Sequence, residues 1–561
     1  MADLRENLDI YYQHVKAVIL SRQHPVTGLL PASTAVNEHG DYRDAWVRDN
    51  VYSILAPWGL ALAYRKLDND DGRNYELEYA VIKVMRGLLF AMMQQAPKVE
   101  AFKTSQHYLD ALHAKYNTAT ADTVVADDAW GHLQLDATSL YLLTLAQMIS
   151  SGLSIIHTLD EVNFVQNLVF YISRTYRTPD YGIWERGDKT NHGEGELNAS
   201  SVALAKAALE ALSGFNLFGM RGSQASVLHV MPDDIARSRI VLEAMLPRES
   251  RSKEIDAALL SAISFPAFAV EDAALVERTR KDIITKLLGN YGLKRFLKDG
   301  HQTVLEDIHR LHYESEELKQ FEHIESEWPL FFTYLMLDGC FFGNNEQVKI
   351  YAEKLEHVAT LRNGIKLLPE LYYVPKESLE AERKTPGSQK RLPNDNVPLV
   401  WGQSLWLLAR MLQDKLVTMF DIDPLGRHQH LDKTSQPVVQ LAVVVEDASL
   451  QETLASRGIP TEIFEQIRPV RLERAAQVSR AYEQIGRNEK LGLSGRPPRR
   501  LLSLSTSRIF RLRGELVVCP PAFFDEREFY LSLDSTFLVE RLRAEIAYIP
   551  RTWSSLGRPT M

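Results

Sequence analysis

Residues 135–153 read LDATSLYLLTLAQMISSGL, and the apolar side chains of this stretch recur at positions i, i+3, i+4 and i+7. This spacing predicts an amphipathic α-helix. The same period continues through residues 51–67, 79–96, 159–176 and 197–212, whereas the alternation typical of strands is almost absent before residue 420. The sequence therefore predicts about twelve helices, paired as helical hairpins in an all-α domain.

Long polar loops rich in Gly, Trp, Asp, Glu and Arg separate the predicted helices. Loops of this length in a compact domain are usually functional or disordered, and their aromatic and charged content favours a function. They span residues 23–46, 115–132, 177–196, 291–327 and 363–400.

The residue pattern changes at about residue 426, where runs of β-branched residues begin to mix with helical stretches. We therefore expect a helical domain over residues 1–425 and a smaller α+β domain over residues 426–561. The sequence stops at SLGRPTM without a helix cap or another stop signal, which leaves open that a longer chain continues beyond it.

The composition narrows the classes of partner. A formal net charge of −9 and a pI near 6.0 argue against nucleic-acid binding, which needs clustered Lys and Arg to neutralise phosphates. The two cysteines, Cys340 and Cys519, lack C-x-x-C spacing, so we expect no disulfide framework, no metal site and a reducing cytoplasm. No apolar run is long enough for a membrane span, and no motif calls for a cofactor.

The junction DYRDAWVRDN holds the first candidate site residues, Trp46, Arg48 and Asp49, where a polar loop becomes a helix. A flat aromatic ring beside a charged hydrogen-bonding pair is the combination that grips a sugar by its face and its hydroxyls. The alternative is structural: Asp49 would stabilise the helix dipole and Arg48 would form a surface ion pair.

A second junction, AWGHLQLDATSL, carries Trp130, His132, Gln134 and Asp136. His132 with Asp127 and Asp128 suggests a metal site only weakly, because no second histidine follows at i+4. Capping and core roles for Gln134 and Asp136 are the plainer alternative.

Two further stretches supply candidate acids. In YGIWERGDKTN (181–191), Glu185 lies between Trp184 and Arg186. A carboxyl group packed on an indole is partly desolvated, so its pKa rises and it is suited to act as a general acid. In LLPELYY, a second carboxylate at Glu370 is suited to orienting and deprotonating water. A surface ion pair for Glu185 and loop solvation for Glu370 are the alternatives.

The order of these motifs resembles a known family. WVRDN, WGHLQLDATSLYLL, GIWERGDKTN, EWPLFF, LLPELY and WGQSLWLLA occur in the order found in the family 15 glycoside hydrolases, the glucoamylase-like (α/α)6 barrels. HPVTGLLPAS (24–33) and LSGRPPRRL (493–501) resemble the regulatory α and β subunits of phosphorylase kinase more closely still. The resemblance covers essentially the whole chain and implies an (α/α)6 toroid followed by a smaller α+β domain.

The resemblance also implies roles for individual residues. Glu185 corresponds to the general acid and Glu370 to the general base of an inverting hydrolase, with carboxyl groups roughly 6.5–9.5 Å apart to admit a water. Arg186 stands where fungal glucoamylases carry a second glutamate. The substrate-binding residues implied by the family pattern are Trp46, Arg48, Asp49, Trp130, Trp184, Arg186, Arg295, Glu327 and Trp328.

Three functional hypotheses follow from the sequence. The first is a protein that binds α-glucan or maltooligosaccharide and removes terminal glucose with inversion. The second is a non-catalytic regulatory subunit of a phosphorylase-kinase-like complex that senses glycogen, with a protein kinase catalytic subunit or further copies of itself as partner. The third is another sugar transformation on the same toroid. The chain lacks the H-R-D and D-F-G motifs of a kinase catalytic chain.

Overall fold

The computed structural model describes residues 2–33, 36–37, 40–68, 70–184, 187–429, 437–512, 514–521, 534–553 and 557–561. The chain forms two compact units. Unit 1 comprises Met1–Leu228 and Ser238–Asp432, and unit 2 comprises His229–Arg237 and Lys433–Met561. The grouping of residues 229–237 with the C-terminal segment has no signal in the sequence.

Six helices of unit 1 form a closed ring, in which each helix contacts the next and the last contacts the first. Every residue from Leu135 to Ile149 is buried, so a helix of this ring is surrounded by protein on all sides instead of presenting one polar face to water. In ring order the helices are α2 (Val47–Ser53), α6 (Leu135–Ser150), α8 (Ala199–Leu212), α10 (Leu259–Ile263), α12 (Leu330–Phe341) and α15 (Val400–Gln413).

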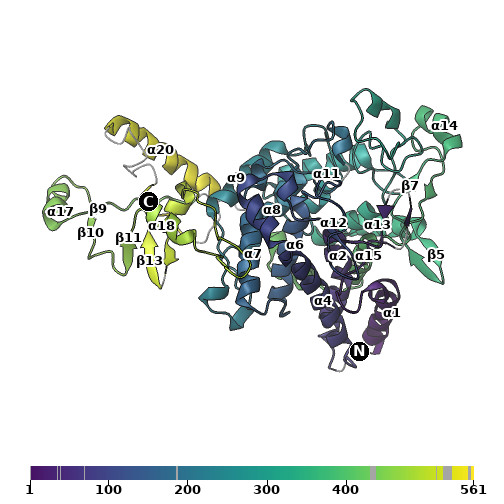
Figure 1. The fold of residues 1–561 in the computed structure, drawn as a ribbon, viewed down its shortest axis with the longest axis horizontal. Coiled ribbons are helices and arrows are strands. Elements are labelled where there is room, and N and C mark those ends of the chain that lie inside the picture. The colour runs from purple at the N-terminus through teal and green to yellow at the C-terminus, as the bar shows by residue number, and fades with distance from the viewer. Residues whose placement is uncertain are drawn as a thin grey trace. The chain divides into compact units, whose positions relative to one another are not determined.

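A helix outside the ring precedes each ring helix in the chain, and Figure 1 shows α1 and α4 lying outside α2 and α15. This repeated hairpin closes an (α/α)6 toroid, which confirms the expected fold class. The outer helices are α1 (Ala2–Val18), α4 (Arg73–Met93), α5 (Ala96–Ser105), α7 (Leu159–Ile172), α9 (Pro232–Met245), α11 (Ala273–Leu287) and α13 (Asn345–Val358).

The outer helices show the amphipathic period that the sequence predicts. In α13 the buried side chains are Val348, Tyr351, Leu355 and Val358, which share one face of the helix. The Asn344 side chain accepts a hydrogen bond from the backbone N–H of residue 347 and so caps the first turn. One face packs on α12, and the opposite face is left to solvent.

Carboxylates from neighbouring loops cap three ring helices. Asp180 accepts a hydrogen bond from the backbone N–H of Leu135 at 3.0 Å, at the start of α6. Glu249 accepts from the Ser200 N–H at 3.1 Å at the start of α8, and Asp256 accepts from the backbone N–H of residue 258 at 2.8 Å just before α10. Each acid satisfies N–H groups that have no partner within their own helix.

The strands of unit 1 are short and lie in the loops between helices. β3 (Ala45–Trp46) pairs with β4 (Lys115–Tyr116) in antiparallel register, which sets Trp46 opposite Lys115. The others are β1 (Val36–Asn37), β2 (Gly40–Asp41), β5 (Thr360–Arg362), β6 (Ile365–Leu367), β7 (Tyr372–Tyr373) and β8 (Leu392–Pro393). The shorter helices are α3 (Leu55–Tyr64), α14 (Leu379–Lys384) and α16 (Met419–Ile422).

Unit 2 combines helices with short strands, as expected for a small α+β unit. A three-stranded sheet runs in the order β11–β13–β12, with β11 parallel and β12 antiparallel to β13. Its core joins Val478 and Tyr482 of a helix to Phe510 and Val517 of the sheet. The elements are β9 (Val444–Val445), α17 (Ala448–Ala455), β10 (Glu462–Ile463), β11 (Val470–Leu472), α18 (Ala475–Tyr482), α19 (Ser503–Thr506), β12 (Phe510–Leu512), β13 (Glu515–Val518) and α20 (Ser535–Thr552).

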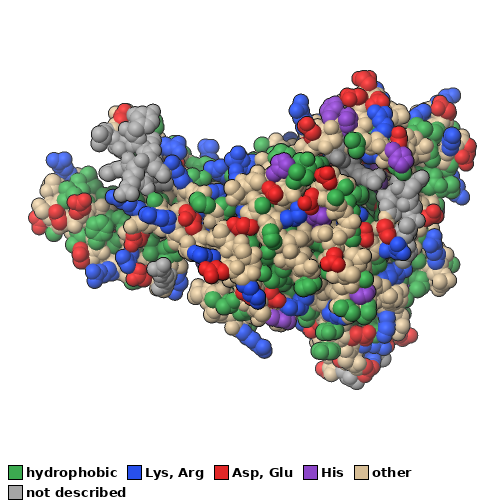
Figure 2. All heavy atoms as spheres, viewed as in Figure 1, with side chains coloured by type: hydrophobic (Ala, Val, Ile, Leu, Met, Phe, Trp, Pro, Cys, Tyr) green, Lys and Arg blue, Asp and Glu red, His purple; other side chains and the backbone are tan. Residues whose placement is uncertain are grey.

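Surface charge and helix length are the features relevant to nucleic-acid and membrane partners. Figure 2 shows basic and acidic side chains interspersed over the face in view. Within the described parts of the chain, no helix has both the length and the apolar character needed to cross a bilayer.

Candidate functional site

A cavity in unit 1 collects most of the residues that the sequence singles out. Its walls come from the N-terminal ends of ring helices α2 and α15 and from the loops that precede α2, α6, α8, α12 and α15, so positions far apart in sequence meet at one end of the toroid. Five of its side chains are tryptophans. The cavity is lined by Ala32, Tyr42, Trp46, Arg48, Asp49, Lys115, Trp130, Trp184, Arg295, His301, Trp328, Glu370, Leu399 and Trp401.

Arg48 is held rigidly at the cavity wall. Its Nη1 donates to Asp136 Oδ2 at 2.9 Å and to Gln134 Oε1 at 3.0 Å, and its Nη2 donates to the Ile183 carbonyl. The side chains of Arg48 and Asp136 are 4% and 0% exposed, so the pair is a buried ion pair and not a surface contact. Gln134 and Asp136 therefore orient the Arg48 side chain.

The Trp184 side chain is held by a hydrogen bond from its indole N–H to an acid and by a cation over its ring. Its indole N–H donates to both oxygens of Asp256, at 3.1 and 3.0 Å. The Arg295 guanidinium lies 4.8 Å from the centre of the Trp184 ring and 5.3 Å from that of Trp328, while Asp299 binds it in bidentate fashion at 2.6 and 2.8 Å. One cation therefore covers the two indoles.

Lys115 forms a similar arrangement on the other side of the cavity. Its ammonium group lies 4.7 Å from the centre of the Trp46 ring and 4.3 Å from that of Trp130. Asp44 provides the counter-charge, with 3.5 Å between the Lys115 Nζ and its Oδ2. The cavity is therefore walled by indoles whose faces are already occupied by cations.

Glu370 lies in the cavity wall with several hydrogen-bond donors around it. Its Oε2 accepts from Asn394 at 2.6 Å, from Asn396 at 2.7 Å and from Gln302 at 3.2 Å. Burial raises the pKa of Glu370, and the amide donors, which favour the charged form, act in the opposite direction. The three amides hold the carboxylate in a fixed position, and the net effect of its surroundings is a raised pKa, which does not weaken Glu370 as a base.

The structure brings eight of the eleven predicted site residues to the cavity. Of the other three, one lies elsewhere and two fall outside the described residues. Glu327 does not line it: its carboxylate accepts from the backbone N–H of Tyr291 at 2.7 Å and pairs with Arg391 at 3.0 Å. Glu185 and Arg186 lie outside the described residues. The separation of the two candidate catalytic carboxyl groups therefore stays a prediction.

The weak metal hypothesis at His132 gains no support. The His132 ring stacks on His113 with 3.8 Å between centroids, and its Nε2 faces the Ala126 carbonyl at 3.1 Å. Asp127 pairs with His113 at 2.6 Å instead. Among the residues that the structure describes, His132, Asp127 and Asp128 do not form a ligand cluster.

Several cavity residues are missing from the predicted set, although Tyr42 lies in the motif DYRDAWVRDN and Trp401 begins the motif WGQSLWLLA. Lys115, Tyr42, His301 and Trp401 line the wall, and Asn394 belongs to the second layer that holds Glu370. Lys115 lies opposite Trp46 because β3 pairs with β4, and this pairing is known only from the structure.

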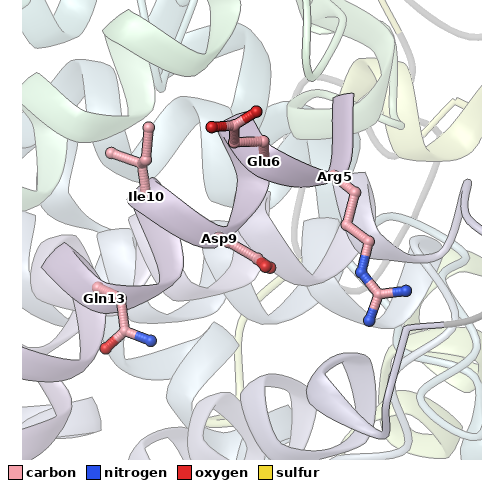
Figure 3. A pocket seen from close by; sticks show the side chains of 5 residues that line it. All are labelled: Arg5, Glu6, Asp9, Ile10 and Gln13. Atoms are coloured by element: carbon pink, nitrogen blue, oxygen red, sulfur yellow. The ribbon is translucent and has the colours of Figure 1, made fainter. Parts of the chain in front are cut away.

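A second depression lies along α1, lined by Arg5, Glu6, Asp9, Ile10 and Gln13, as Figure 3 shows. Two of its three charged groups already have partners, because Arg5 pairs with Asp71 and Asp9 with Arg73. We therefore do not regard this single-helix groove as the functional site.

Comparison with known proteins places the toroid in a family. The sequence profile of the glycosyl hydrolases family 15 matches residues 5–549. The chain belongs to this family. A solved structure described as "Glycosidase Wild Type" superposes with a TM-score of 0.51 at 18% identity, covering 74% of this chain and 98% of that one, which supports the same fold.

Curated relatives match nearly the whole chain. It is 52% identical over 558 residues to the skeletal muscle isoform of the phosphorylase b kinase regulatory subunit alpha of Oryctolagus cuniculus, covering 99% of this chain and 45% of the relative. It is 49% identical over 556 residues to the probable subunit alpha of Drosophila melanogaster, covering 98% and 44%. The predicted resemblance is confirmed, and the chain spans about half the length of these relatives.

Proposed function

We propose that this protein is a regulatory chain of a phosphorylase-kinase-like assembly and that its toroid binds the end of an α-glucan without rapid cleavage. The observation that carries the proposal is the 52% identity, over almost the whole chain, to proteins named as regulatory subunits. A protein kinase catalytic chain is the partner that this similarity favours.

The chemistry of the cavity supports sugar as the ligand. Sugar rings bind to aromatic side chains through their apolar faces and to charged groups through their hydroxyls, and the cavity offers both. The buried indole N–H of Trp328 has no hydrogen-bond partner within the described residues, so it is a donor available to a hydroxyl oxygen. Satisfying a buried donor of this kind contributes about 1–3 kcal/mol.

Two features of the cavity limit how far a sugar ring can enter and so favour binding of a chain end over productive hydrolysis. Lys115 and Arg295 cover indole faces on which sugar rings would otherwise stack. The cavity volume is about 70 Å³, compared with roughly 300–1,000 Å³ for typical ligand pockets, so a terminal sugar would have to displace Lys115 to enter.

Inverting hydrolysis is the second candidate function. It is favoured by Glu370 in the cavity wall and by Trp184, whose chain neighbour is Glu185. A protein that keeps both acids would protonate the glycosidic oxygen with one of them and deliver water with the other.

Calorimetry with maltooligosaccharides, combined with a glucose-release assay that resolves the anomer, separates these functions. The regulatory proposal expects saturable binding without glucose release, and Trp328→Phe, which removes the N–H donor together with part of the ring, should raise Kd at least about tenfold. Trp553→Phe in unit 2 is the matched control and should leave Kd unchanged. Release of inverted glucose that Glu370→Gln abolishes would establish the hydrolase instead.

The partner is tested separately. The purified chain is mixed with a phosphorylase-kinase-type catalytic chain and followed by analytical ultracentrifugation and by kinase activity. A complex with altered kinase activity supports a regulatory role. Absence of sugar binding, cleavage and complex formation together would refute both functions.

A further inference from the structure

A cluster of two imidazoles and a carboxylate lies outside the cavity. His192 follows the short 3₁₀ turn Gly187–Thr190 in the loop that leads to α8, and His312 and Glu314 lie in the loop between α11 and α12. The two rings meet edge to face, with 5.9 Å between their centroids and an interplanar angle of 66°. Residues more than a hundred positions apart thus form one polar cluster.

The two loops are joined by contacts beside the cluster. The backbone N–H of Tyr313 donates to the Lys189 carbonyl at 3.0 Å, and the Lys189 ammonium pairs with Glu306 at 3.1 Å. His192 itself has φ of 56°, a left-handed conformation that a non-glycine residue adopts only when its surroundings impose it. The main chain therefore fixes where the three side chains begin.

The spacing of the ligand atoms fits a small cation better than a hydrogen-bond network. Glu314 Oε2 lies 3.6 Å from His192 Nδ1, and Glu314 Oε1 lies 3.7 Å from His312 Nε2. All three ligand groups offer atoms within 4.8 Å of one another. Bonds of about 2.0–2.1 Å in a tetrahedral zinc site place neighbouring ligand atoms about 3.3 Å apart, so small side-chain rotations bring the three groups into place.

The nearby cations do not compete for the carboxylate. Arg310 binds both oxygens of Glu317 at 2.7 Å, and Lys189 is engaged with Glu306. Among the described residues, Glu314 pairs with no lysine or arginine. Imidazole ring nitrogens are the commonest metal ligands among protein side chains.

We propose that His192, His312 and Glu314 form a zinc site that clips the two loops together, with water completing the coordination. Two imidazoles and one carboxylate suit Zn²⁺, and the partial exposure of all three side chains, 57%, 39% and 62%, gives the ion an open route. The clipped loops belong to the connections that carry Trp184 on one side and Arg295 and His301 on the other.

The experiment uses the full chain after removal of metal with EDTA. Titration with Zn²⁺ in the calorimeter should give one equivalent per chain with a Kd of about 1 µM or tighter. Substitution of Co²⁺ should give the visible absorption of a nitrogen and oxygen site without the thiolate charge-transfer band that binding at Cys340 or Cys519 would produce.

Variants decide whether these three side chains are the ligands. His192→Ala and His312→Ala should each weaken Zn²⁺ binding by at least about tenfold, whereas the exposed His157→Ala should match the wild type. All variants should melt close to the wild type in EDTA, because the His192 and His312 side chains are 57% and 39% exposed and His157 is exposed. In the wild type only, Zn²⁺ should slow amide hydrogen exchange around Lys189 and Tyr313. No stoichiometric binding, or equal affinity in the double histidine variant, would overturn the proposal.

Discussion

Replacing Asp136 with asparagine tests whether the cavity depends on a buried charge pair. The substitution keeps the size of the side chain and one oxygen acceptor but removes the negative charge that faces Arg48 at 2.9 Å. Because both side chains are almost fully buried, the guanidinium cannot recover its lost partner by turning to water. The variant therefore removes a buried counter-charge from the Arg48 guanidinium.

The expected loss of stability follows from the burial. Breaking a buried ion pair by removing one partner costs about 3–5 kcal/mol. Unit 1 has about 420 residues, and at about 2.1 cal/mol/K per residue its unfolding entropy is about 0.9 kcal/mol/K. Asp136→Asn should therefore lower the Tm of unit 1 by about 3–6 °C.

Differential scanning calorimetry measures this shift, with an exposed ion pair as the control. Glu316 pairs with Lys319 while 83% exposed, so Glu316→Gln should change the Tm by less than about 1 °C. The double variant Arg48→Met with Asp136→Leu should recover much of the loss, because replacing both charges with apolar groups of similar size is often neutral. An Asp136→Asn variant that melts with the wild type would refute this reasoning.

Two further predictions concern pH and the cavity wall. Burial, together with the nearby charge of Asp256, raises the pKa of Glu249 to about 8, so its contribution to stability is full below its unfolded pKa near 4.5 and is lost as the pH rises through about 8. Across pH 5–8 the free energy of unfolding of Glu249→Gln should fall less steeply with pH than that of the wild type, by up to about 1.4 kcal/mol per pH unit. Thermal melts over this pH range measure the difference, and an equal slope would contradict the assignment. Lys115→Met frees the faces of Trp46 and Trp130 and should tighten maltooligosaccharide binding about threefold to tenfold by calorimetry, whereas unchanged or weaker binding would show that the ammonium does not obstruct the sugar.

Much of the toroid is readable from the sequence because its outer helices bury one face. In α13, for example, four buried side chains share one side of the helix, at the spacing that predicts an amphipathic helix. The Trp, acid and Arg junctions that the sequence singles out lie close together in the structure, since Trp46, Arg48 and Glu370 line one cavity. Their catalytic and binding roles remain predictions.

The remaining site residues are not readable in this way because they act through tertiary contacts. Gln302, Asn394 and Asn396 surround Glu370 but come from irregular loops with no periodic signal. Glu327 follows its motif neighbour Trp328 in sequence, yet its carboxylate serves Arg391 and the turn at Tyr291. Adjacency in the chain does not decide which of two side chains enters a cavity.

Closure of the ring has a consequence for how the chain must be made. Helix α15 packs on α2, although about 350 residues separate them, so the circle is completed only when its last member has been synthesised. Until then α2 presents an uncovered apolar side to the cell. A truncation before Val400 would leave this seam open, so nascent chains and premature-stop products should be the forms of this protein that need chaperones most.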